Sequence, residues 1–80
     1  MNSLRDKAKV ASYSDGYVTV KMESSLEYRF PIAGNPRLKS GSNADLNTIE
    51  ISPYGLHWST LDEDLSFQGI ARGDFGQRLG

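Results

Sequence analysis

The chain has 80 residues, enough for one domain, and apolar residues make up only 38% of them. Nine basic residues against ten acidic ones leave a net charge of −1, so nothing in the charge balance would attract nucleic acid or an anionic membrane. Cysteine is absent, whereas small domains in oxidising compartments are usually held together by disulfides, and we therefore expect a cytoplasmic protein. We also expect no membrane span and no signal peptide, because no long apolar run occurs.

The start of the chain predicts two strands joined by a hairpin turn. Lys9–Ser14 predicts a first strand, and Asp15-Gly16 after it is the strongest short hairpin signal. Tyr17–Met22 is rich in β-branched residues and predicts a second strand. Alternation places three of its apolar residues on one face: Val18, Val20 and Met22.

A third strand is predicted directly after these two. Glu23-Ser24-Ser25 indicates a tight turn, and the alternation in Leu26–Phe30 follows it. Pro31 cannot donate to a ladder, so the strand should stop there. The apolar side chains expected to share one face are Leu26, Tyr28 and Phe30. The first thirty residues thus predict a three-stranded antiparallel meander whose apolar face needs a cover.

The middle of the chain carries two helix starts. Asn35-Pro36 combines an N-cap residue with proline at the first helical position, and a short turn of helix should follow through residues 37–39. Ser42-Asn43-Ala44-Asp45 resembles a capping box with Asp in place of Glu, which predicts one or two helical turns through Leu46.

Two short strands and a helix are predicted in the second half. Thr48–Ile51 should be a strand with Ile49 and Ile51 on one face, and after a turn at residues 53–55 Leu56–Trp58 should return as another. Ser66 is placed to cap a last helix, and Gly73 to end it. The residues expected to share the packed face of that helix are Phe67, Ile70 and Ala71.

These elements predict the α+β class. The expected architecture is a small antiparallel sheet, formed by the N-terminal meander plus two short strands, covered by two or three short helices. We expect a single domain over residues 1–80, with an ordered core from about residue 9 to about residue 73 and flexible ends.

The run from Gly55 to Ser66 gathers the single Trp, the single His and three consecutive acids. In a strand, Leu56 and Trp58 would face one way and His57 the other, which predicts Trp58 in the core and His57 outside. A lone His without a second His or a Cys is a weak metal signal. In known Ser–His–Asp sites the three residues come together from separate segments of the chain. Ser59 is almost adjacent to His57 in the sequence, so we reject such a site here.

The acids Asp62-Glu63-Asp64 allow several interpretations. They could be ligands for a divalent cation, a general acid–base pair, or contacts to a basic partner. The structural alternative is that Asp62 or Asp64 caps the turn after the strand or lies near the positive end of the last helix. In that case Leu61 and Leu65 on either side would anchor the turn to the core.

The chain resembles a bacterial family of domains of unknown function, number 2442. The resemblance extends from about Val10 to Gly73. It is carried by these motifs in order: Phe30-Pro31-Ile32, Pro36-Arg37-Leu38, Gly55-Leu56-His57-Trp58, Leu61-Asp62-Glu63-Asp64-Leu65-Ser66, and Gly69-Ile70 with Gly73. The chain departs from the family pattern at Ser59, at Ser24-Ser25, at Leu46 and in the short loop Ser52-Pro53-Tyr54.

The resemblance implies a compact α+β domain with no established enzyme activity, cofactor or catalytic residue. It also implies a pairing with a small protein encoded nearby, of the kind suspected to form toxin–antitoxin systems. Our leading hypothesis is a non-catalytic protein-interaction module, the antitoxin-like member of such a pair. Under this hypothesis we expect no cofactor, no direct contact with nucleic acid and no contact with a membrane. The expected partner-binding residues are Tyr54, His57, Asp62, Glu63 and Asp64.

Two alternatives remain open. One is a small-ligand or metal-binding domain that uses His57 and the three acids. The other is a homo-oligomer formed through an exposed sheet edge such as Lys9–Ser14, because unpaired edges invite strand pairing.

Overall fold

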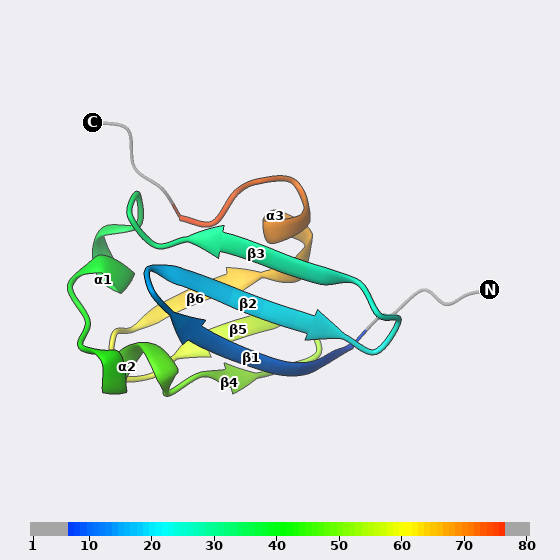
Figure 1. Ribbon diagram of the computed structural model, residues 1–80, viewed down its shortest axis with the longest axis horizontal. Helices are drawn as coiled ribbons and strands as arrows, with labels where there is room; N and C mark the ends of the chain where they lie inside the picture. The colour runs from blue at the N-terminus through cyan, green and yellow to red at the C-terminus, as the bar shows by residue number, and fades with distance from the viewer. Residues whose placement is uncertain (1–6, 77–80) are drawn as a thin grey trace.

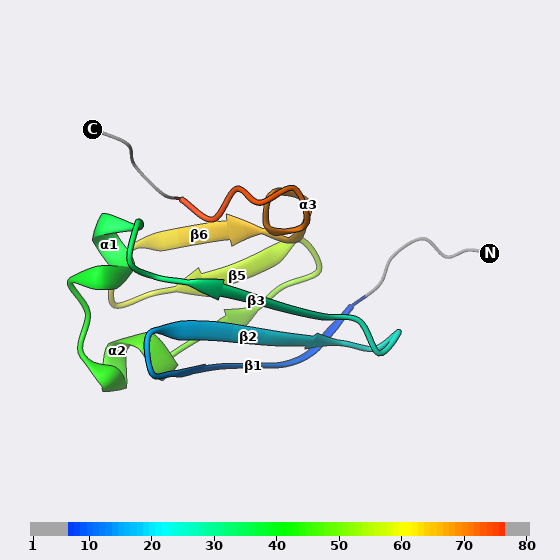
Figure 2. The same ribbon diagram turned by 45° about the horizontal axis from the view of Figure 1, so that its top comes forward.

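Two three-stranded antiparallel sheets form the computed structural model, which describes residues 7–76 (Figure 1). The first sheet has the strand order β1 (Ala8–Ser14), β2 (Tyr17–Met22) and β3 (Glu27–Pro31). The second has the order β4 (Glu50–Ile51), β5 (Gly55–Trp58) and β6 (Glu63–Ser66). The sheets lie one over the other as two layers (Figure 2).

Three short helices complete the fold of residues 7–76: α1 (Pro36–Lys39), α2 (Asn43–Asn47) and α3 (Phe67–Ala71). The first two connect the sheets at one end, and α3 packs beside β3 and β6 at the other (Figure 1). The arrangement confirms the predicted α+β class. None of the helices among residues 7–76 is long and apolar enough to cross a membrane.

The core lies between the two sheets. Alternate side chains of the first sheet point inward, and the buried ones are Val18, Val20, Met22 and Phe30. The second sheet contributes Leu56, Trp58 and Leu65, and the three helices add Leu38, Leu46 and Ile70. Trp58 has no exposed surface, and its indole Nε1–H donates to the Leu46 carbonyl at 3.0 Å. The prediction that Trp58 is a core residue is confirmed.

Local signals in the sequence account for the turns and caps. Asp15 and Gly16 both have positive φ, 51° and 87°, which is the type I′ geometry that matches the twist of a two-residue hairpin. Asn35 caps α1 through its side-chain oxygen. Ser42 and Asp45 form the predicted capping box of α2.

The capping box perturbs the titration of its carboxylate. The backbone N–H of Ser42 donates to Asp45 at 3.1 Å, and side-chain hydrogen bonds with Thr60 and Ser42 add to this contact. These bonds favour the charged form, so the pKa of Asp45 lies below its ordinary value.

The second sheet contains a strand that the sequence interpretation missed. We expected the acids to lie in a turn between a strand and a helix. Instead the turn ends at Asp62, which has a φ of 53°, and β6 begins at Glu63. The strand β6 pairs with β5 along its whole length. The run from Gly55 to Ser66 is therefore a β-hairpin that leads directly into α3.

Three apolar residues lie elsewhere than predicted. Leu26 is 55% exposed because it belongs to the turn before β3, where Met22 N–H donates to its carbonyl. Ile51 is also exposed, and β4 has only two residues because Thr48 is still the C-cap of α2. Ala71 is exposed, and the buried or half-buried residues of α3 are Phe67, Gly69 and Ile70.

Packing continues past the expected end of the core. Phe75 is half-buried, and its ring stacks on that of Phe30 with centroids 5.2 Å apart. Gly73 ends α3 with a φ of 86°, as predicted. The expectation of flexible ends at residues 1–6 and 77–80 lies outside the described residues.

Candidate functional site

The outward face of β5 and β6 is built by strand alternation. Leu56 and Trp58 turn toward the core, so His57 between them faces outward. On β6 the pattern is half-buried, exposed, buried, exposed, which turns Asp64 and Ser66 outward. The predicted orientation of His57 is therefore confirmed.

His57 stands in a row of ionisable side chains across the second sheet. The register pairs Glu50 of β4 with His57 of β5, and His57 with Asp64 of β6. Directly opposed residues in antiparallel strands project to the same face, with Cβ atoms about 5 Å apart. The imidazole is thus flanked by one carboxylate on each neighbouring strand.

The imidazole is hydrogen-bonded to one of these two carboxylates. His57 Nδ1 lies 2.7 Å from Asp64 Oδ1, and both side chains reach solvent, with exposed fractions of 36% and 77%. In the neutral ring this contact places the proton on Nδ1, which leaves Nε2 as a hydrogen-bond acceptor. The pair can therefore accept hydrogen bonds from a ligand both at Nε2 and at the second oxygen of Asp64.

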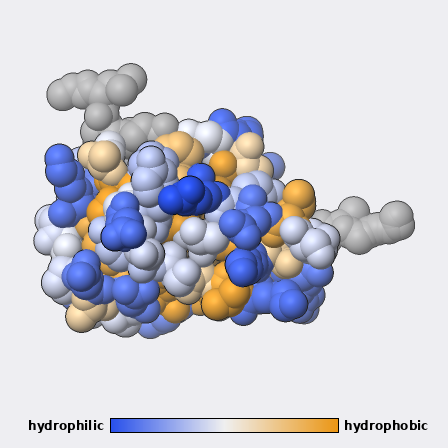
Figure 3. All heavy atoms as spheres, in the orientation of Figure 1, coloured by the Kyte–Doolittle hydropathy of each residue, from blue (hydrophilic) through white to orange (hydrophobic). Residues whose placement is uncertain are grey.

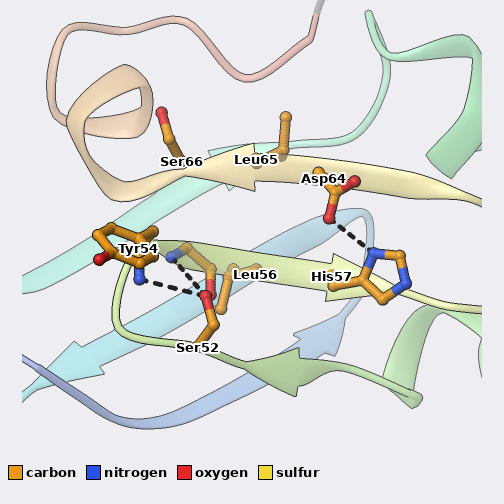
Figure 4. A pocket seen from close by; sticks show the side chains of 8 residues that line it. Ser52, Tyr54, Leu56, His57, Asp64, Leu65 and Ser66 are labelled. Atoms are coloured by element: carbon orange, nitrogen blue, oxygen red, sulfur yellow. Dashed lines mark hydrogen bonds and ion pairs between the residues drawn. The ribbon is translucent and has the colours of Figure 1, made fainter.

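A shallow pocket of about 160 Å³ lies beside this pair and has a mostly apolar lining (Figure 4). Tyr54 and Ser52 lie at one end of it and the His57–Asp64 pair at the other. The remaining lining residues are Gly55, Leu56, Leu65 and Ser66.

The turn that carries Tyr54 is held by hydrogen bonds. Ser52 Oγ accepts from the backbone N–H groups of Tyr54 and Gly55, each at 3.1 Å. The carbonyl of Tyr54 accepts from the N–H of Phe67 at the start of α3. The side chain of Tyr54 is nevertheless 75% exposed, so a fixed backbone presents a free ring to solvent.

The three consecutive acids do not converge. Asp62 lies 3.6 Å from Arg37 Nη1 at the β5–β6 turn, and Glu63 turns inward. Only Asp64 lines the pocket. Of the five predicted partner-binding residues, the structure brings Tyr54, His57 and Asp64 together and leaves Asp62 and Glu63 apart from them. Among residues 7–76 no three His, Asp or Glu side chains are grouped closely enough to hold a metal ion.

Glu63 instead belongs to a buried polar junction around Asn35. The Asn35 side chain is buried, and its Nδ2 donates to Glu63 Oε2 at 2.8 Å and to the Phe75 carbonyl at 3.0 Å. Its Oδ1 accepts from the backbone N–H groups of Arg37 and Leu38. One amide thus joins α1, β6 and the C-terminal segment. The sequence signalled the cap but not the two long-range bonds.

Gly55 is a second residue whose importance the site prediction missed. A Cβ at this position would collide with the backbone carbonyl of Leu65 and lie 2.8 Å from the Cα of Ser66. Glycine is therefore required for β5 to approach β6 at the floor of the pocket. The one signal of this close approach in the sequence was a glycine directly before a predicted strand.

Comparison with known proteins decides the family. A family model described as "Protein of unknown function (DUF2442)" matches residues 8–76. The chain belongs to this family. The predicted resemblance is confirmed, and residues 55–66, which hold two of its motifs, form the β5–β6 hairpin of this DUF2442 domain.

A crystal structure similar to this DUF2442 domain comes from Rhodospirillum rubrum ATCC 11170 and is described as a protein of unknown function, at 2.75 Å resolution. The two chains are 36% identical and superpose with a TM-score of 0.78, over 91% of this chain and 93% of the other. No curated protein matches this chain. The comparisons therefore support the fold and the family and leave the activity open.

Proposed function

We propose that this DUF2442 domain is a non-catalytic protein-interaction module, and that it binds a small protein through the outward face of β5 and β6. The finer part of the proposal is that it is the antitoxin-like member of a two-protein bacterial system, whose other member is encoded beside it. The observation that carries the proposal is the pocket with the exposed Tyr54 at one end and the His57–Asp64 pair at the other.

The size of the pocket favours a protein partner over a cofactor. Sites for small molecules usually enclose about 300–1,000 Å³ and bury most of the ligand. The pocket here is about 160 Å³ and shallow, which suits a single side chain of a larger partner. Exposed tyrosines are enriched among residues that dominate binding energy in protein interfaces. Tyr54 meets that description because its ring is free while its backbone is fixed.

The alternative function, a small-ligand or metal site on His57 and the three acids, has weaker support. Asp62 pairs with Arg37 and Glu63 with Asn35, so His57 and Asp64 remain as a two-ligand set. Divalent cations take more ligands than two. Titration with Mg²⁺, Mn²⁺ and Zn²⁺ tests this alternative, because a ligand of the native state must raise the melting temperature.

Co-expression with the neighbouring gene product tests the proposed function. The chain should co-purify with that protein, and Tyr54→Ser and Asp64→Asn should each weaken the complex. Matched controls lie on other surfaces: Tyr17→Ser on the outer face of the first sheet and Asp15→Asn in the first hairpin. Loss of binding in the controls but not in the pocket variants, or no complex at micromolar concentration and low salt, would contradict the proposal.

The outer face of the first sheet is the appropriate comparison surface (Figure 3). Hydrophobic side chains there are scattered among hydrophilic ones, and the exposed ones include Val10 and Tyr17. The Tyr17 ring is already covered by Arg29, whose guanidinium carbon lies 4.3 Å from the ring centroid. A tyrosine of this face is therefore engaged, whereas Tyr54 is presented to solvent.

A further inference from the structure

We infer that the pocket between Tyr54 and the His57–Asp64 pair receives one arginine side chain of the protein partner. This inference rests on the proposed function, because it names the chemistry of the group that the same surface binds. Size, lining and charge each contribute a separate argument.

The volume matches an arginine side chain. An apolar cavity of about 150 Å³ accommodates benzene, which has about six heavy atoms. The arginine side chain beyond Cβ also has about six heavy atoms, and the pocket measures about 160 Å³. A tryptophan or a nucleotide base with its sugar would not fit in this space.

The lining is polar at one end and apolar in the middle. Leu56, Gly55 and Leu65 contribute to a mostly apolar lining between Tyr54 and Asp64. Long basic side chains bury their methylene stems along such surfaces while the charged head reaches a polar group. A stem that enters past the Tyr54 ring would bring its head toward Asp64.

The charge at the polar end is complementary to a cation. Asp64 and Glu50 flank His57 across the sheet, and no lysine or arginine among residues 7–76 lines the pocket. Asp64 Oδ1 is bonded to His57, so Oδ2 can accept from a guanidinium N–H. A guanidinium group is planar, is more weakly hydrated than an ammonium group and presents its N–H donors in a fixed fork, so it suits a carboxylate beside a mostly apolar lining better than lysine does.

Titration of the ¹⁵N-labelled full chain with small probes tests the inference at constant ionic strength. The probes are n-butylguanidinium, n-butylammonium and the neutral n-butylurea. n-Butylguanidinium should shift the amide signals of Tyr54–His57 and Asp64–Ser66 in a saturable way. n-Butylammonium should bind more weakly, and n-butylurea should produce no saturable shift. Asp64→Asn should weaken n-butylguanidinium binding about tenfold, since a charge-assisted hydrogen bond is lost, while Asp15→Asn leaves binding unchanged.

Other results of the same titration would overturn the inference. Equal binding of n-butylurea would show that charge is irrelevant, and tighter binding of n-butylammonium would assign the pocket to lysine. Saturable shifts elsewhere in the chain, without shifts at the pocket, would place guanidinium binding at another surface.

An arginine scan of the neighbouring gene product separates this inference from the proposed function. Replacing one arginine of that protein by methionine should weaken the complex as strongly as Asp64→Asn does. If the complex depends on Tyr54 and Asp64 but on no single arginine, the inference fails and the proposed function stands. If no complex forms, the proposed function fails, and the probe titration still decides whether the pocket binds a guanidinium group.

Discussion

Substituting Asn35 by aspartate isolates the buried junction that holds β6 in place. Asn35 is only 1% exposed, and its amide makes four hydrogen bonds. Asp is as good an N-cap as Asn, so Asn35→Asp keeps the two bonds to the start of α1. It removes the two donated bonds, to Glu63 Oε2 and to the Phe75 carbonyl, and brings a second carboxylate against Glu63.

The expected cost follows from these contacts. Two unit charges at the observed 2.8 Å repel by about 6 kcal/mol at an effective dielectric constant of 20, before any relaxation. Glu63 is only half-buried and can move away from the new charge. The half-buried Phe75 carbonyl also loses the hydrogen bond from Asn35, at a further cost of about 0.5–1.5 kcal/mol. We therefore expect Asn35→Asp to lower the free energy of unfolding by about 3–5 kcal/mol.

Urea unfolding followed by Trp58 fluorescence measures this loss, and a double-mutant cycle assigns it. In the double variant Asn35→Asp/Glu63→Gln, the introduced glutamine amide can donate to the introduced carboxylate, so part of the stability should return. A coupling energy of at least about 1.5 kcal/mol is expected. Asn43→Asp, an exposed change in the first turn of α2, is the control and should stay within about 0.5 kcal/mol of the parent. If Asn35→Asp matches that control, or if the coupling is zero, the junction does not have the role assigned to it.

Three further changes test other parts of the fold. Trp58→Ala should cost about 3–5 kcal/mol by circular dichroism, because it empties the core and leaves the Leu46 carbonyl unpaired; a loss under 1 kcal/mol, roughly, would contradict this. Gly55→Ala should cost at least about 2 kcal/mol, since its Cβ would collide with the Leu65 carbonyl; an unchanged melting temperature would contradict it. The pKa of Asp45 is lowered in the folded chain, so its stabilisation is present at neutral pH and is lost as pH falls through the acid range. Unfolding curves of Asp45→Asn and the parent should therefore differ at pH 7 and converge in acid, and a constant gap would refute the assignment.

The sequence predicts local structure well where a short motif contains all the interacting groups. The Asp15-Gly16 turn and the Ser42–Asp45 capping box are of this kind, because each is closed by residues two or three positions apart. The core position of Trp58 could be predicted from its size and from its place in an alternating segment, because both favour burial of the side chain.

The strand β6 could not be predicted in this way. Its inward positions are Glu63 and Leu65, so the charged first member breaks the apolar alternation that signals a strand. Glu63 tolerates that position because Asn35, 28 residues earlier, donates to its carboxylate. A contact at that separation has no local signature in one sequence.

Only part of the candidate site could be predicted, for the same reason. Tyr54, His57 and Asp64 meet because β5 and β6 pair in one register, which follows only once β6 is recognised. Once the alternation of β6 is known, Glu63 must point away from Asp64. The acids that look like one cluster in the sequence therefore have three separate partners.

Amide hydrogen exchange on the complex with the neighbouring gene product shows whether the outward face of β5 and β6 is the binding surface. Binding should add protection at residues 52–57 and 64–66 and leave the exchange of β1 to β3 unchanged. Added protection confined to the edge strand β1, with none around Tyr54 and Asp64, would contradict it.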